Sequence, residues 1–156
     1  MAIATTLEKF LQKHGVEYDI MAHPRSYTSM ETAQVSHVPG DSLAKSVLLR
    51  DGQGYLVAVL PATHRLDLER MERLLDRHVE LATEKEAGAL FGDCDSGAIP
   101  PCGKAYGLGT IVDEALTRQR EIWFEAGDHE ELVHLGGAQF DALMENADHA
   151  AISRHV

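Results

Sequence analysis

The chain has 156 residues, of which 44% are hydrophobic and 25% charged, and its formal net charge at pH 7 is −11. This length and composition are typical of one soluble domain that can bury a core without help from metals or disulfides. The negative charge argues against a surface that binds nucleic acid non-specifically. Any contact with nucleic acid therefore requires a local cluster of basic residues.

The sequence carries no sign of a membrane or secreted protein. No apolar run is long enough to span a bilayer, and the N-terminal segment has neither the basic start nor the long apolar stretch of a secretory signal. The two cysteines, Cys94 and Cys102, have no partner pair and are expected to be free thiols. We therefore expect a cytoplasmic protein without a membrane partner.

Three expected helices begin with a threonine that is followed three residues later by a glutamate, at Thr5, Thr28 and Thr83. In this pattern, the capping box, the two side chains satisfy free N–H groups of the first helical turn. Glycine or proline ends these helices, and apolar residues at helical spacing predict two more. The expected helices cover about residues 5–15, 29–37, 66–77, 83–92 and 138–144.

Two apolar runs, Leu43 to Arg50 and Tyr55 to Leu60, flank a glycine-rich turn and predict a β-hairpin that Pro61 ends. Short strands are expected near residues 78–81, 109–112, 122–124 and 132–135. The tail from Glu145 to Val156 lacks an apolar face, so we expect it to fray and the ordered core to cover about residues 3–145. Together these elements predict one α/β (α+β) domain over residues 1–156, with a mixed sheet and surrounding helices.

Lys45 is the least expected charge in the sequence. Side chains alternate between the two faces of a strand, so Lys45 shares a face with Leu43, Val47 and Leu49. This is the bulkier apolar face, and we expect it to point inward. A buried ammonium group needs a partner or a cavity, which favours a pocket at this lysine. The alternative is a lysine near a strand end that extends to solvent.

The segment from Gly97 to Gly103 contains Pro100 and Pro101 between glycines. Consecutive prolines exclude the middle of a helix or of a central strand, while glycines allow sharp turns and leave backbone N–H groups uncovered. The segment is either an ordinary tight loop or the rigid wall of a small-molecule site. Cys102 has no recognisable base, and we expect it to pack as a small apolar residue rather than act as a nucleophile.

His129 and His134, with the acidic residues around them, invite a metal-site interpretation. Residues five apart in a strand point to opposite faces, so the two histidines would not converge on one ion. No further histidine or cysteine stands at ligand spacing, and we expect neither a metal nor a cofactor. His129, shortly after Gly127, is a candidate polar group at a pocket rim or a surface histidine in a turn.

The best basic cluster lies on the helix expected over residues 66–77. Arg70, Arg73 and Arg77 recur at helical spacing and form one stripe. They are candidates for contacts with nucleic-acid phosphates. The alternative is a solvent-exposed face on which these arginines pair with acidic residues of the same helix.

Three segments together resemble the YbaK / prolyl-tRNA synthetase-associated editing family. They are Ser42 to Val47 with its lysine, the loop from Gly97 to Gly103, and Gly127-Asp128-His129. The start of the chain also fits, with a helix, a strand, His23-Pro24 and a second helix led by threonine. The likeness extends to about Met144. It implies a mixed, partly barrel-like β-sheet surrounded by helices, with a pocket between them.

The resemblance implies hydrolysis of the ester that joins a wrong amino acid to tRNA. It assigns Lys45 to the phosphate or ribose of the terminal adenosine, and it places His129 where relatives shape the side-chain pocket or hold the substrate amine. The last strand of this chain lacks an aspartate that some relatives have, which leaves the edited amino acid open. The residues implied to bind substrate are Thr28, Gly97, Ala98, Ile99, Pro100, Pro101, Gly103 and Gly127.

The implied mechanism is substrate-assisted, because a neighbouring tRNA hydroxyl helps to position or activate water. Positioning and backbone N–H groups would then supply most of the rate. The implied partners are the acceptor end of aminoacyl-tRNA and an aminoacyl-tRNA synthetase, for a monomer or a small homo-oligomer. Two alternatives stay open: a tRNA- or synthetase-binding module of the same fold without catalysis, and a metal-dependent hydrolase that uses His129.

Overall fold

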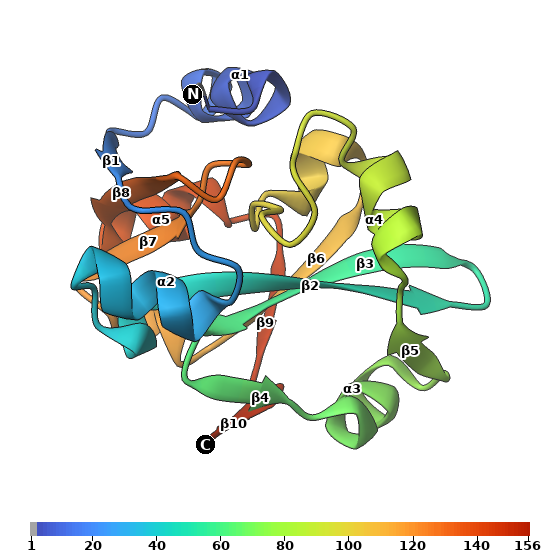
Figure 1. Ribbon diagram of the computed structural model, residues 1–156. Coiled ribbons are helices and arrows are strands. Elements are labelled where there is room, and N and C mark those ends of the chain that lie inside the picture. Colours follow the sequence, from blue (N-terminus) through green and yellow to red (C-terminus); the bar gives the residue numbers. More distant parts are fainter. Residues whose placement is uncertain (1–2) are drawn as a thin grey trace.

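The long hairpin predicted from the sequence forms the centre of the fold. β2 (Leu43–Asp51) and β3 (Gly54–Pro61) pair antiparallel along almost their whole length. The computed structural model describes residues 3–156 and builds an eight-stranded sheet around this hairpin. The strand order is β1-β8-β7-β2-β3-β6-β9, and β5 also pairs with β2 (Figure 1).

The sheet is mixed, as predicted. β7 joins β2, β6 joins β3 and β9 joins β6 in parallel, whereas the other pairs are antiparallel. A separate two-stranded ladder pairs β4 with β10. The remaining strands are β1 (Asp19–Ala22), β4 (His64–Leu66), β5 (Val79–Leu81), β6 (Gly109–Asp113), β7 (Glu121–Glu125), β8 (Glu131–Gly136), β9 (Asp148–Ala150) and β10 (Ser153–His155).

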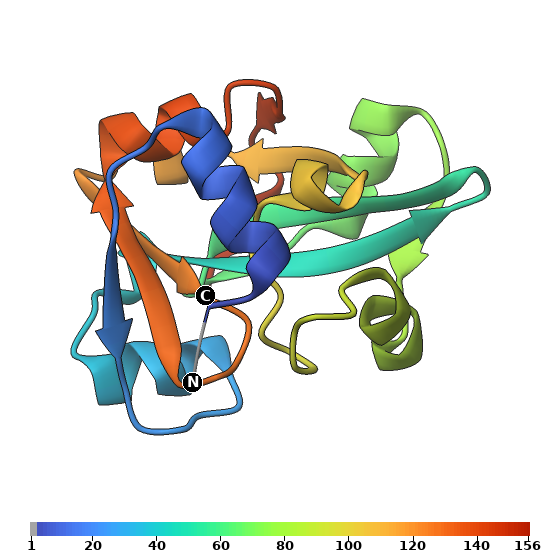
Figure 2. The same cartoon turned by 90° about the horizontal axis from the view of Figure 1, so that it is seen from above.

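Helices cover both faces of the sheet. The α-helices are α1 (Thr5–His14), α2 (Ser29–Ser36), α3 (Leu68–Leu75), α4 (Glu84–Leu90) and α5 (Gly137–Leu143), and the 3₁₀ turns are η1 (Gly40–Ser42), η2 (Gly103–Tyr106) and η3 (Leu116–Arg118). α1, α4 and α5 pack on the face that carries Ala44 and Leu48, where the largest apolar cluster lies. α2 and α3 cover the other face, each over a smaller cluster (Figures 1 and 2). Among residues 3–156, every helix is too short or too polar to cross a membrane.

The C-terminal tail belongs to the sheet, and the expectation that it frays is wrong. β9 extends the sheet beside β6, β10 pairs with β4, and Ile152 between them is fully buried. The Asp113 carboxylate accepts hydrogen bonds from the Ile152 N–H at 3.0 Å and from the Ser153 hydroxyl at 2.6 Å. Strands of three residues are too short to show an alternating pattern, so the sequence gives no sign of this closure.

One of the three capping predictions is also wrong. Thr83 and Glu86 form the complete capping box of α4, and Thr28 accepts a hydrogen bond from the Glu31 N–H at the start of α2. The cap residue of α1 is Ala4, which has no side-chain acceptor, so Thr5 lies within the helix. Asp93 supplies the acceptor instead, 2.9 Å from the Thr6 nitrogen. A residue distant in sequence has replaced the local cap.

Candidate active site beside strand β2

The sheet has a gap along one edge of β2. β7 pairs with β2 only at Leu43 and Ala44, and β5 begins to pair only at Leu49. Within residues 3–156, the stretch from Lys45 to Leu48 therefore has β3 on one side and no strand on the other, although the Leu48 carbonyl accepts a hydrogen bond from the Ala82 N–H at 3.0 Å. The loop between α4 and η2 runs beside this part of β2 in both views of the molecule (Figures 1 and 2). An unpaired sheet edge presents backbone donors and acceptors that a ligand can use.

Lys45 stands at the start of this gap. Its side chain is half-buried, its Nζ donates to the Ala62 carbonyl oxygen at 3.4 Å, and it makes no ion pair with any residue from 3 to 156. Burial lowers the pKa of this ammonium group, and the positive charge of Arg65 lowers it further. Both effects would be relieved by an anion. The site therefore has a cation that lacks a counter-charge.

The surroundings of Lys45 correct one part of the sequence prediction. Lys45 does share a face with Val47 and Leu49, but these residues pack with the smaller cluster under α3. The largest core lies on the opposite face, with Ala44 and Leu48. Both faces of this central strand are covered by other parts of the protein. The size of the side chains on each face therefore does not show which face packs against the main core.

Two strand residues at the gap have buried oxygen atoms without a hydrogen-bond partner among residues 3–156, namely Ser46 Oγ and Glu125 Oε2. Unpartnered buried polar atoms are rare in folded proteins and often mark functional sites. Glu125 follows directly on the last pair between β7 and β2, and its other oxygen accepts from the Thr32 hydroxyl at 3.4 Å. Burial raises the pKa of the Glu125 carboxyl to about 7, and the nearby Asp128 contributes.

His129 lies against the start of the glycine–proline loop. Its Nε2 donates to the Ser96 carbonyl oxygen, so in the neutral ring Nδ1 keeps the lone pair. A Cβ placed on Gly97 would lie 3.3 Å from His129 Cε1, and Gly97 has a φ of +79°. The Tyr27 ring also packs near His129, with the two ring centroids 6.0 Å apart. The structure thus brings together two predicted residues, Gly97 and His129, and adds Tyr27.

The loop is held in place by contacts that the sequence did not reveal. The Arg25 guanidinium lies 3.7 Å from carboxylate oxygens of both Asp95 and Glu130, and it donates to the Asp128 carbonyl at 3.4 Å. The Gly127 carbonyl accepts from the Asp95 N–H at 2.7 Å. Gly127 is itself buried against Ala4 and Cys94. Its observed role is to anchor the loop.

The second half of the loop faces a different part of the molecule. Ala98 is fully buried, while Ile99 and Cys102 pack in the main core. Burial raises the pKa of the Cys102 thiol, which agrees with the prediction that it packs and does not attack substrate. Pro101, Cys102 and Gly103 line a cavity of about 450 Å³ beside α1. The prediction that the whole loop forms one wall is therefore too simple.

Thr28 directly follows Tyr27, whose ring packs near His129, whereas the three predicted arginines lie on another part of the molecule. Thr28 uses its hydroxyl to cap α2. Arg70, Arg73 and Arg77 lie on or just after α3, which packs on the opposite face of the sheet from the main core. Arg77 forms an ion pair with Asp51, and Arg70 lies 3.9 Å from Asp67. The arginine stripe is thus partly paired, and its contact with nucleic acid stays a prediction.

Sequence reasoning missed Arg25, Ser46 and Glu125. A weak signal for Glu125 exists, because a charged residue between Phe124 and Ala126 interrupts a strand just before Gly127. Arg25 carries no such signal, because its partners lie about 70 and 105 residues further along the chain.

Comparisons with known proteins identify the family and the fold. The profile of the aminoacyl-tRNA editing domain matches residues 23–143. A crystal structure of a candidate trans-editing enzyme for prolyl tRNA synthetase is 25% identical, with a TM-score of 0.85 over 97% of this chain and 96% of the other. A protein from a study of epitope backbone grafting onto scaffolds is also 25% identical, with a TM-score of 0.85 over 97% of both chains. A candidate signal transduction protein from Marinobacter aquaeolei shares the fold at 21% identity and a TM-score of 0.78, over 97% of this chain and 31% of that one. No curated protein matches the chain.

Proposed function

The chain belongs to the aminoacyl-tRNA editing domain family, and we propose that it is a free-standing hydrolase that deacylates mischarged aminoacyl-tRNA. The observation that carries this proposal is the half-buried Lys45 ammonium group without a carboxylate partner, at the unpaired edge of β2. Translation-quality control of this kind takes place in the cytoplasm, which is where we propose that the protein acts.

Lys45 supplies the positive charge that the acceptor end of tRNA requires. A half-buried cation without a counter-charge costs free energy, and a phosphate group of the terminal nucleotide offsets that cost when it binds. The chain as a whole carries a net charge of −11, so attraction must come from local groups such as this one. Binding is therefore expected to be weak and to weaken further as salt increases.

In the proposed reaction, a water oxygen attacks the ester carbonyl carbon and the carbonyl becomes an oxyanion. The bond between that carbon and the ribose oxygen then breaks. The ribose oxygen takes up one proton of the attacking water, and the free amino acid leaves as a carboxylate after the other proton has passed to solvent. The second hydroxyl of the terminal ribose positions or activates the water. Backbone N–H groups at the β2 edge and in the Gly97 loop are the available donors for the oxyanion.

His129 has a fixed orientation that suits substrate positioning. Its Nε2–H is engaged by Ser96, so Nδ1 is the ring atom that can accept a hydrogen bond from the substrate amine. Gly97 lies directly against the ring, and any larger residue there would push on it. We therefore assign His129 and the first half of the loop to the aminoacyl group.

A deacylation panel tests the proposal. Purified protein is mixed with tRNAs that each carry one wrong amino acid, beginning with proline tRNA, and the remaining ester is measured against spontaneous hydrolysis. We expect faster hydrolysis of at least one mischarged tRNA, and no effect of a chelator. A panel that stays intact would contradict the enzyme. Binding of tRNA or of a synthetase without hydrolysis would favour the binding module, for which the acidic surface argues.

A further inference from the structure

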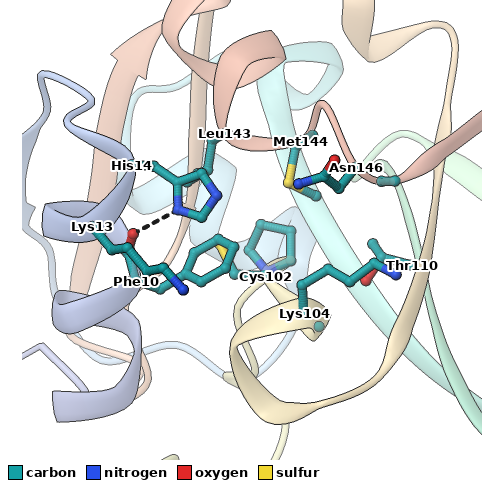
Figure 3. Close-up of a pocket in the computed structure, with 12 residues that line it drawn as sticks. Phe10, Lys13, His14, Cys102, Lys104, Thr110, Leu143, Met144 and Asn146 are labelled. Carbon is teal, nitrogen blue, oxygen red and sulfur yellow. Dashed lines mark hydrogen bonds between the residues drawn. The ribbon is translucent and has the colours of Figure 1, made fainter.

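A cavity lies beside α1, at the second half of the glycine–proline loop. It measures about 450 Å³ and is formed by α1, η2 and the segment after α5 (Figure 3). Pro101, Cys102 and Gly103 form part of its wall. His129 is not among the residues that line this cavity, and it lies against Ser96 and Gly97 at the other end of the loop. The cavity is therefore distinct from the site proposed for deacylation.

One wall of this cavity is a pair of rings. The centroids of Phe10 and His14 lie 4.2 Å apart, and His14 Nδ1 donates to the Phe10 carbonyl at 3.0 Å. This bond fixes the histidine ring beside the phenylalanine and leaves Nε2 free to accept (Figure 3). Leu143 and Met144 add apolar surface. Such a wall suits a flat ring, because aromatic side chains stack on planar ligands.

The rim of the cavity is positive. Lys13 and Lys104 both line it, and a neighbouring groove joins these two to Lys9. Three of the five lysines of the chain thus gather at one place. None of the three forms an ion pair within residues 3–156. No acidic residue lines the cavity, although the chain contains 25. An anionic group is the ligand that this rim favours.

We propose that this cavity binds a nucleoside monophosphate group. The base lies against Phe10 and His14, and the phosphate lies between Lys13 and Lys104. Asn146 and Thr110 supply polar groups for the base edge and the ribose. The cavity volume is within the range of about 300–1,000 Å³ that small-molecule sites occupy. The two rings and the two lysines without ion-pair partners match the two halves of such a ligand.

Titration with AMP tests this proposal without any measurement of deacylation. We expect AMP to bind the wild-type protein, and adenosine and inorganic phosphate each to bind about tenfold more weakly, because each provides only half of the contacts. The Lys13→Ala/Lys104→Ala double variant should bind AMP at least about tenfold more weakly. Both lysines are at the surface, so the variant should fold. Lys85→Ala, which removes a lysine from α4, is the matched control and should bind AMP normally.

The proposal is overturned if AMP does not bind, if the double variant binds AMP as well as the wild type does, or if inorganic phosphate binds as tightly as AMP. Uncharged tRNA added to the AMP complex then identifies the source of the ligand. Displacement of AMP supports the site and assigns it to a nucleotide of the tRNA end. Retention of AMP supports the site and assigns it to a free nucleotide. A protein that binds AMP but hydrolyses no aminoacyl-tRNA would refute only the proposed function.

Discussion

Two carboxylates in the strands of the sheet have opposite environments. Asp113 in β6 is buried, and its oxygens accept hydrogen bonds from the Ala115 and Ile152 N–H groups and from the Ser153 hydroxyl. Glu125 in β7 receives one long bond from Thr32 and leaves an oxygen without a partner. The first lies where the C-terminal tail closes the sheet, and the second lies where β7 and β2 separate.

The difference separates stability from function in this fold. Where every polar group is matched, the sheet continues and the chain end is held in place. Where the strands separate, charges and polar atoms stay unmatched, as at Lys45 and Ser46. Such groups cost stability in the free protein, and under the proposed function they would become matched when a substrate binds. Changes in the first region should therefore affect folding, and changes in the second should affect activity.

The largest effect on folding is expected for Asp113→Ala. Removal of the carboxylate leaves buried donors without an acceptor, including the Ile152 N–H, so the free energy of unfolding should fall by about 2–4 kcal/mol. Urea unfolding measures this loss. Glu114→Ala, which removes the exposed neighbouring acid, is the control and should change stability little. An Asp113→Ala variant as stable as the wild type would show that the tail is not held by this residue.

Glu125→Gln should have the opposite effect at neutral pH. The folded carboxyl has a pKa of about 7, above its unfolded value, so the folded state binds the proton more tightly. Wild-type stability should therefore fall as pH rises from about 4.5 to 7, by at most about 3 kcal/mol. The glutamine variant lacks this titration. Unfolding curves should show that the free energy of unfolding of the variant, relative to that of the wild type, is higher at pH 8 than at pH 5. An equal pH dependence of stability in both proteins would contradict a raised pKa at Glu125.

Gly97→Ala and Gly107→Ala form a matched pair. Both glycines have a positive φ, +79° and +74°, so both substitutions strain the backbone by about 1 kcal/mol. Only at Gly97 would the new methyl group press on His129, since nothing lies within 4 Å of a Cβ at Gly107. We expect both variants to lose similar stability and only Gly97→Ala to lose activity, by about tenfold. Equal activities would remove His129 and Gly97 from the site.

The smallest effect is expected on the arginine stripe of α3. Arg73 is exposed and is the member of the stripe that forms no ion pair within residues 3–156. If the stripe contacts tRNA, Arg73→Glu should raise KM about two- to threefold at low salt and leave kcat unchanged, because a single exposed phosphate contact is weak. Arg118→Glu, on η3, serves as the control. An unchanged KM for Arg73→Glu would discard the stripe as a tRNA contact.

The sequence predicted those parts of the fold that have a local cause. The hairpin around Gly52 and the capping box at Thr83 depend on neighbouring residues, and both are present. The α1 cap and the strands β9 and β10 depend on Asp93 and Asp113, which lie far away in the chain. Local patterns cannot show such contacts, and three-residue strands have too few positions to display a period.

The same limit applies to the candidate site. Lys45 was recognisable because a charge in an apolar strand is unusual, and Gly97 because glycines beside two prolines restrict the backbone. The conformation of the loop was not recognisable, because the ion pair between Arg25 and Asp95 joins residues that are 70 positions apart in the sequence. That conformation decides that Gly97 lies against His129 while Pro101 lines the cavity beside α1. Which part of the molecule each loop residue contacts follows only from the folded chain.

The most direct test of the account is the single-turnover rate of deacylation by Lys45→Ala beside Lys85→Ala, with the melting temperature of each variant. Removal of the unpaired cation should slow hydrolysis by about 100-fold or more and leave the melting temperature equal to or above that of the wild type. Lys85→Ala should match the wild type in both. A Lys45→Ala variant that hydrolyses mischarged tRNA at the wild-type rate would contradict the claim that the gap beside β2 is the active site.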